Sequence, residues 1–228
     1  MSALFFYTFI LRMKKILSAQ NEKLFIIGAF FVFVVGLSFL GWWKLEHFRY
    51  NALDFAIFNQ TFYNTSQGNF FQQTIHPPTY LKDHFPPLLL FLSILYSPFK
   101  SPFALIVMQN IALGLGIFPI FWLAKKFLDK KFSAVLAILY LVNPFVLNLS
   151  LFEFHMLSFA VPLLLCAVYY FLEKRFWKFL LFLSLALLVR EDVSLVIFMF
   201  GLLALIEKRN PRWALAPILL SVTYFIAA

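Results

Sequence analysis

Charged residues are scarce in this chain of 228 residues, at 13% of the total, whereas apolar residues make up 63%. A soluble domain is closer to half apolar and about a quarter charged. A globule of this size cannot hide so much apolar surface from water. The composition therefore excludes a water-soluble enzyme, a disordered chain and a coiled coil. It indicates an all-α polytopic membrane protein whose main solvent is lipid.

Cysteine and glycine are also scarce, with one and seven residues. The single cysteine, Cys166, lies inside an apolar run, so no disulfide, thiolate zinc site or redox pair can form within the chain. The net charge of +9 would suggest a nucleic-acid partner in a soluble protein. In a membrane protein such a surplus sets the orientation of the loops, and we expect no nucleic-acid partner.

Apolar runs predict about seven transmembrane helices, each of which ideally needs about 20 residues. They lie at 24–43, 103–124, 132–149, 156–172, 176–189, 193–206 and 213–228. A further run, 86–99, is shorter, begins with Pro86-Pro87 and ends with Ser97-Pro98. Its length is typical of an interfacial or re-entrant helix rather than a span.

The positions of Lys and Arg decide whether 86–99 crosses the membrane. If it does not cross, 14 of the 19 basic residues share the side of the N-terminus, whereas only six do so if it crosses. Because basic loops favour the cytoplasm, we predict seven spans, a cytoplasmic segment 1–23 with an interfacial helix, and an outer loop 44–102. The chain ends at Ala228 inside an apolar run, so we expect the transmembrane domain 24–228 to be part of a longer protein.

This topology gathers most groups with proton or phosphate chemistry on the outer face. They include all four histidines and six of the ten acids, which are His47, His76, His84, His155, Glu46, Asp54, Asp83, Glu153, Glu191 and Asp192. They come from the loop 44–102 and from the turns after the third and fifth spans. A loop of this length is usually functional.

In the loop, Asp54 lies on a predicted helix from Asn51 to about Tyr63 that ends before Gly68. Asp54 is a candidate general base or metal ligand, although an Asp near a helix start is often only a cap. His84 is a second candidate, to bind phosphate or position an acceptor. Its alternative role is a hydrogen bond to the backbone beside the proline pair.

The two turns contribute the remaining candidates. Glu153 and His155 are two residues apart and point the same way if the backbone is extended, as an acid–imidazole pair or as metal ligands. Arg190 suits a donor phosphate because its planar fork binds such groups, with Glu191 and Asp192 orienting it or holding a divalent ion. The short spans on either side place this triplet below the outer surface, where charges must be paired or face a wet cavity. The alternative is a self-neutralising ion pair.

Four motifs in order resemble a family of predicted membrane proteins, the domain of unknown function 2079. They are the Asp-containing loop helix Leu53–Gln60 with Gly68, the Asp-His-Phe-x-Pro element Asp83–Pro87, the element Phe152–His155 and the basic-Glu-Asp-Val element Arg190–Val193. The resemblance runs from about Phe48 to Ala228. The chain departs from it at Asn59, where an acid is common, and at Glu153, where Asp is common.

That family is in turn similar to the GT-C glycosyltransferases, which carry an acid on a helix of a long first outer loop and a basic helix end after span two, here Lys125–Leu128. The resemblance implies sugar transfer from a polyprenyl-phosphate donor to an extracytoplasmic acceptor in a prokaryotic plasma membrane. Its partners would be membrane lipid and the lipid-linked donor, and a divalent ion held by Asp54, Glu153 or Asp192 stays open. Two rivals remain: a transporter or flippase using the same cavity, and a non-catalytic assembly subunit.

Overall fold

The computed structural model describes residues 22–75 and 78–228. Within those ranges every regular element is a helix, apart from an isolated bridge between Gln72 and Thr79, which confirms the all-α prediction. The helices are α2 (Glu22–Glu46), α3 (Ala52–Ser66), η1 (Tyr80–Lys82), α4 (Leu88–Tyr96), α5 (Pro102–Leu115), α6 (Ile117–Ala124), α7 (Lys130–Leu141), α8 (Pro144–Leu151), η2 (Met156–Phe159), α9 (Ala160–Leu172), α10 (Phe176–Leu187), α11 (Val193–Ile206) and α12 (Pro211–Ala227). The surface helix predicted within 1–23 and His76 fall outside these ranges, except for the two residues that open α2.

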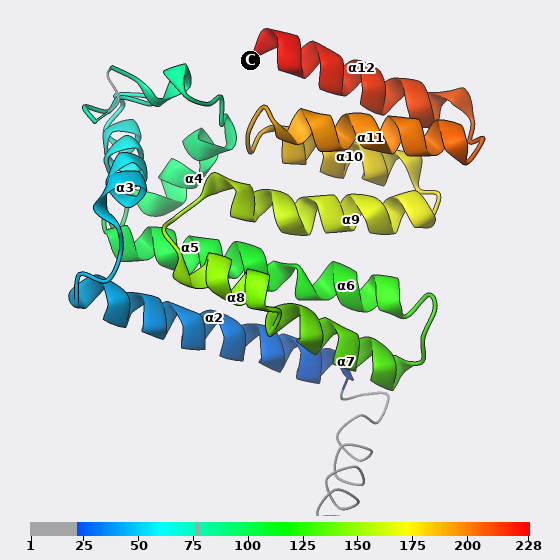
Figure 1. Cartoon of the computed structure of the whole chain (residues 1–228), viewed down its shortest axis with the longest axis horizontal. Helices are drawn as coiled ribbons and strands as arrows, with labels where there is room; N and C mark the ends of the chain where they lie inside the picture. The colour runs from blue at the N-terminus through cyan, green and yellow to red at the C-terminus, as the bar shows by residue number, and fades with distance from the viewer. Residues whose placement is uncertain (1–21, 76–77) are drawn as a thin grey trace, which may run out of the picture.

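The long apolar helices lie side by side along one axis (Figure 1). Helix α2, the pair α5–α6, the pair α7–α8 and helices α9 to α12 follow each other back and forth between the two ends of the molecule. Helices α3 and α4 stand apart from this bundle at one end. The arrangement is that expected of a helical membrane protein with one elaborated loop.

Two helical stretches are long and apolar enough to cross a bilayer by themselves, Glu22–Glu46 and Pro102–Ala124. The pair α7–α8 counts as a third if its 41° bend lies within one span. That bend follows from Pro144, which starts α8 and whose ring cannot continue α7. The other apolar helices of the described part are shorter, so the set of seven spans stays a prediction.

The loop 44–102 folds largely as its sequence predicts. Helix α3 runs from Ala52 to Ser66, and Gly68 follows with a φ of 90°, a conformation that glycine adopts without strain. The run 86–99 forms only α4, with nine residues, which is too short to span a bilayer. The Leu88 N–H at its start donates to the Leu188 carbonyl at 2.7 Å, so the loop is tied to the end of α10.

An aromatic core joins this loop to the bundle. The rings of Phe58 and Phe62 on α3 pack edge-on against Phe154, with centroids 5.1 and 5.4 Å apart. Phe62 also packs against Tyr96 on α4, and Phe154 is fully buried. Such contacts bury large apolar area, and they hold α3 beside the turn after α8.

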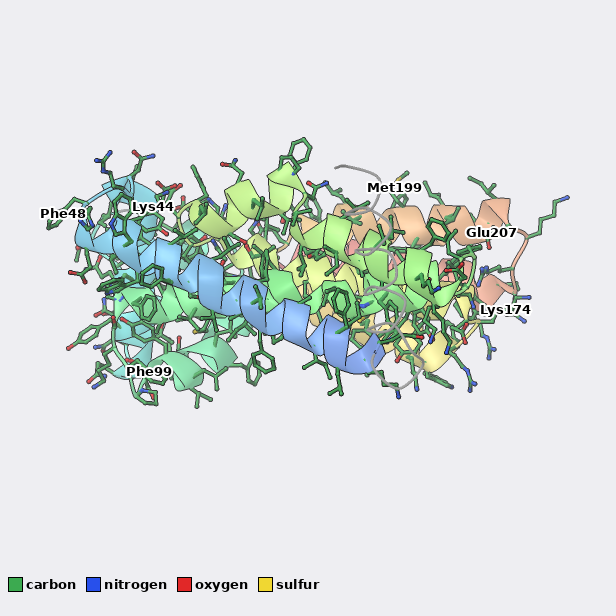
Figure 2. All side chains as sticks on the ribbon, turned by 90° about the horizontal axis from the view of Figure 1, so that it is seen from below. Lys44, Phe48, Phe99, Lys174, Met199 and Glu207 are labelled. Carbon is green, nitrogen blue, oxygen red and sulfur yellow. The ribbon has the colours of Figure 1, made fainter. Side chains whose placement is uncertain are left out.

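The two ends of the bundle carry different chemistry. The turns after α6, α9 and α11 meet at one end, which we call the basic end, and they hold Lys125, Lys126, Lys174, Arg175, Lys208 and Arg209. Residues 47–75, 78–101, 152–155 and 188–192 lie toward the other, which we call the histidine end. Figure 2 shows Lys44, Phe48 and Phe99 at the histidine end and Lys174 and Glu207 at the basic end.

Candidate functional site

The first turn of α3 presents Asp54 at the histidine end. Its side chain is 51% exposed, and its Oδ2 atom lies 3.8 Å from Nε2 of His155. Helix α3 positions Asp54 because the adjacent Phe55 and Phe58, one turn further along, are buried in the hydrophobic core. The exposed carboxylate and the imidazole therefore form a pair whose members are 101 positions apart in the sequence.

Phe152 and His155 have extended backbone angles, and both polar side chains of this turn reach the start of α3. Glu153 accepts the Asn51 N–H at 2.9 Å through Oε1, while His155 faces Asp54. Glu153 is only 3% exposed, so its carboxylate stabilises the beginning of α3 from inside the protein. The two residues meet different partners at the start of α3 and do not bond to each other's side chain.

A buried amide of α5 holds this turn in place. Gln109 accepts the His155 N–H at 2.7 Å and donates to the Leu149 carbonyl at 2.8 Å. Because unpaired polar groups are costly in an apolar interior, these bonds lock the otherwise irregular backbone. The sequence analysis did not predict a role for Gln109, although a glutamine inside an apolar run indicates a buried hydrogen-bonding position.

The protonation pattern of His155 follows from its neighbours. Its Nδ1 atom lies 2.9 Å from the Glu153 carbonyl oxygen. A carbonyl only accepts, so Nδ1 carries the proton. Nε2 is then the atom that meets Asp54, and it forms an ion pair when the ring takes up a second proton.

At the turn between α10 and α11, Arg190 and Asp192 pair with each other through two parallel hydrogen bonds, of which the Nε–Oδ1 bond is 2.8 Å long. The Arg190 guanidinium lowers the pKa of Asp192 against the opposing effect of burial. The same hydrogen bonding raises the pKa of Arg190. The pair uses Nε and Nη2, so the N–H groups on Nη1 are not part of it.

Glu191 points the other way and ties the loop to this turn. It accepts His84 Nδ1–H at 2.7 Å and the Phe85 N–H at 2.8 Å. Burial opposes its ionisation, but these two donors outweigh it and lower the pKa of Glu191. Because a carboxylate only accepts, His84 holds its proton on Nδ1 and has Nε2 for another partner.

Tyr80 lies close both to the charges at the start of α3 and to those of the α10–α11 turn. Its ring packs against Phe58 at 5.2 Å and His84 at 6.0 Å between centroids. Burial raises the pKa of its phenol, and the positive charge of Arg190 partly offsets this. The carboxylates of Asp83, Glu191 and Asp54 raise it further. Charges from both α3 and the α10–α11 turn are therefore close enough to act on one hydroxyl.

The structure brings the predicted residues together in pairs rather than in one cluster. Asp54 joins His155, His84 joins Glu191, Arg190 joins Asp192, and Glu153 serves the backbone of α3. Among the described residues, no three His, Cys, Asp or Glu side chains are grouped to hold a metal ion. Asp54, Glu153 and Asp192 therefore do not form a three-ligand set.

Asn59, one of the two departures from the family pattern, has a packing role here. Its Oδ1 atom accepts the Tyr96 hydroxyl at 2.9 Å, which joins α3 to α4. Tyr96 is fully buried, so this bond lies in the interior between α3 and α4. The side chain is thus engaged in the interior and not at the exposed face that carries Asp54.

Comparison with known proteins identifies the family of the chain. Residues 44–228 match the family described as predicted membrane protein (DUF2079). The chain belongs to this family. The match covers all three stretches of the candidate site and both departures, and it excludes only the N-terminal part of the chain. No curated protein and no solved structure matches the sequence.

Proposed function

We propose that this DUF2079 protein spans a prokaryotic plasma membrane seven times, with its N-terminus and basic end in the cytoplasm and its histidine end outside. One feature supports the location in the membrane, and another supports the orientation. Large apolar side chains such as Phe31, Val32 and Ile226 are exposed on the helices, as lipid-facing residues are. The lysine-rich turns share one end, which is the pattern of cytoplasmic loops.

In this orientation the protein is a glycosyltransferase that moves a sugar from a polyprenyl-phosphate donor to an extracytoplasmic acceptor. The observation that carries the proposal is that an exposed carboxylate, Asp54, and an arginine, Arg190, are both close to the buried Tyr80 at the histidine end, although each forms its ion pair with another residue. A glycosyl transfer of this kind needs a proton acceptor for the incoming hydroxyl and a cation for the leaving phosphate.

The proposed step is a single displacement. The acceptor hydroxyl oxygen forms a bond to the anomeric carbon while its proton passes to Asp54, beside which His155 stabilises the charged form. The bond from that carbon to the phosphate oxygen breaks, and its electron pair stays on the phosphate. Arg190 stabilises the polyprenyl phosphate that leaves, through the N–H groups that its pair with Asp192 does not use.

The lengths of α10 and α11 support the location of the donor phosphate. Their 12 and 14 residues correspond to about 18 and 21 Å at 1.5 Å per residue. A hydrocarbon core is about 30 Å thick. Helices this short favour a turn no higher than the outer headgroups, which supports Arg190 as the group that meets the donor phosphate.

The test is release and transfer of label from polyprenyl-phosphate sugars by the purified chain in liposomes, for Asp54→Asn and Arg190→Ala. Loss of the base is expected to reduce transfer by a factor of about 10²–10⁴. Loss of the phosphate-stabilising cation is expected to cost a factor of about 10²–10³. Glu46→Gln and Arg49→Ala are matched controls, because both residues are exposed at the same end and neither belongs to the site.

Each alternative function has its own result in this assay. Movement of intact lipid-linked sugar between leaflets, with no transfer, favours the transporter or flippase. Absence of both activities, together with stable association with another membrane protein, favours the assembly subunit. Transfer that is equally fast in Asp54→Asn and Glu46→Gln contradicts the proposed role of Asp54.

A further inference from the structure

A cavity at the basic end is built for an anion and lies away from the candidate site. It has a volume of about 440 Å³, and its lining includes Lys174, Lys208, Arg209, Arg212, Glu207 and Trp213. Sites for small molecules commonly measure about 300–1,000 Å³. The lining comes from the turns after α9 and α11, and Figure 2 shows a residue of each, Lys174 and Glu207, at the same end of the bundle.

The two turns that frame the cavity are built alike. Each ends its helix with the triplet Glu-Lys-Arg, at 173–175 and at 207–209. In each, the N–H of the arginine bonds to the carbonyl five residues earlier, at 3.0 Å. Both lysines, Lys174 and Lys208, have positive φ, 55° and 51°, at the position where glycine is usually preferred. The chain thus places lysine twice where the backbone alone favours glycine.

The acid in the lining is already neutralised. Glu207 pairs with Arg209, whose Nε lies 2.6 Å from Oε2. Arg209 is further fixed by a 2.6 Å hydrogen bond to the Phe171 carbonyl and by stacking over the Phe171 ring. Within the described residues, no ion pair holds Lys174, Lys208 or Arg212. Three positive charges therefore face the cavity in excess.

Exposed apolar side chains on the last turn of α11 indicate the kind of anion. Ile206, directly before the lining residue Glu207, is 77% exposed, and Leu205 is 55% exposed. Trp213 lines the cavity and packs against Phe176 and Phe179, at 5.2 and 5.3 Å between centroids. A soluble phosphate has no use for this surface, whereas a lipid places its headgroup among the cations and its acyl chains along α11.

We propose that this cavity binds the phosphate headgroup of an anionic phospholipid from the leaflet at the basic end. Lys174, Lys208 and Arg212 contact the phosphate, and Arg209 is the packed support beneath it. This site is independent of the proposed transferase reaction. Basic pockets between transmembrane helices are suited to such headgroups, and each nearby Lys or Arg increases affinity for anionic lipid about fivefold.

The test uses the whole chain, purified in detergent and titrated with phosphatidylglycerol, with lipid binding measured by native mass spectrometry. The triple variant Lys174→Gln, Lys208→Gln, Arg212→Gln is expected to bind phosphatidylglycerol about 100-fold more weakly. The matched control Lys23→Gln, Lys125→Gln, Lys131→Gln removes the same number of charges from the same end but from segments that do not frame the cavity. It is expected to change binding by less than about threefold.

Two further arms separate the possible outcomes. Glycerol 3-phosphate and phosphatidylcholine are expected not to displace phosphatidylglycerol. Equal weakening in both triple variants, or displacement by glycerol 3-phosphate at matched concentration, overturns the proposal. If the cavity triple variant is not monodisperse, Lys208→Gln alone is expected to weaken binding about fivefold, and unchanged binding in that variant overturns it as well.

Discussion

Replacement of Glu191 by alanine is expected to release the segment 80–87 from the α10–α11 turn. The Glu191 carboxylate accepts two donors of this segment, His84 Nδ1–H at 2.7 Å and the Phe85 N–H at 2.8 Å. Hydrogen bonds to a charged group contribute about 1.5–3 kcal/mol each. The Glu191 side chain is 22% exposed, so in the variant water can hydrogen-bond to the freed donors and offset part of the lost energy. We therefore expect the free energy of local opening to fall by about 2 kcal/mol.

Amide hydrogen exchange measures that opening directly. A change of about 2 kcal/mol corresponds to a roughly 30-fold faster exchange of the Phe85 amide and its neighbours. The bond from the Leu88 N–H to the Leu188 carbonyl is unaffected, so the increase is expected to stop at the start of α4. Asp192→Ala removes the same charge from the same turn, but the Asp192 side chain bonds to Arg190 and to no donor of the segment, so exchange in 80–87 is expected to change far less than in Glu191→Ala.

Acid is expected to act like the Glu191→Ala substitution. The hydrogen bonds from Phe85 and His84 hold the pKa of Glu191 below the ordinary 4.5, against the opposing effect of burial. The Glu191 carboxylate therefore stabilises the folded loop fully above pH 4.5. The contribution is lost as pH falls through the lower, folded-state pKa. After correction for intrinsic rates, exchange in 80–87 should rise in that range in the wild type but not in Glu191→Ala. Equal exchange in Glu191→Ala and Asp192→Ala would refute the reasoning.

Three other predictions concern stability. Glu153→Ala leaves the Asn51 N–H without its acceptor, and exchange in the first turn of α3 is expected to rise about 5–30-fold. Gly201→Ala places a Cβ 2.9 Å from a backbone oxygen of α12 and is expected to lower the free energy of unfolding by about 1–3 kcal/mol. The thermal midpoint of this variant, followed by tryptophan fluorescence, is expected to fall. Gly28→Ala, where the new Cβ has no neighbouring atom within 4 Å, is the control whose midpoint is expected to stay unchanged. Burial, with the nearby Glu153 charge, raises the pKa of Tyr50 to about 12, so the folded protein is expected to lose stability as pH rises from about 10 to about 12. The difference in absorbance at 295 nm between the wild type and Tyr50→Phe is expected to show the Tyr50 phenolate forming near pH 12.

Local signals in the sequence predict the elements well. Apolar length separates α2 from α4, because 25 residues cross a bilayer and nine do not. The glycine after α3 and the proline that starts α8 mark a helix end and a bend at the places where the structure has them. Such features depend on neighbours in the chain, so a single sequence contains them.

The pairing of the site residues depends on distant segments and could not be read in this way. Glu191 meets His84 across 107 positions, and Glu153 meets Asn51 across 102. The sequence indicated that these acids lie at the same end, because the distribution of Lys and Arg predicts the topology. It carried no signal that Glu153 would be buried under α3 while Asp54 stays exposed, since that follows from how the aromatic core packs.

The most direct test of the account is the side of the membrane on which Asp54 lies. In a Cys166→Ala background, Asp54→Cys and Lys131→Cys place single thiols at exposed positions at the histidine and basic ends. A membrane-impermeant maleimide added to intact cells is expected to label Asp54→Cys at once and Lys131→Cys only after the membrane is permeabilised. Labelling in the reverse order would contradict the orientation on which the proposed sugar transfer depends.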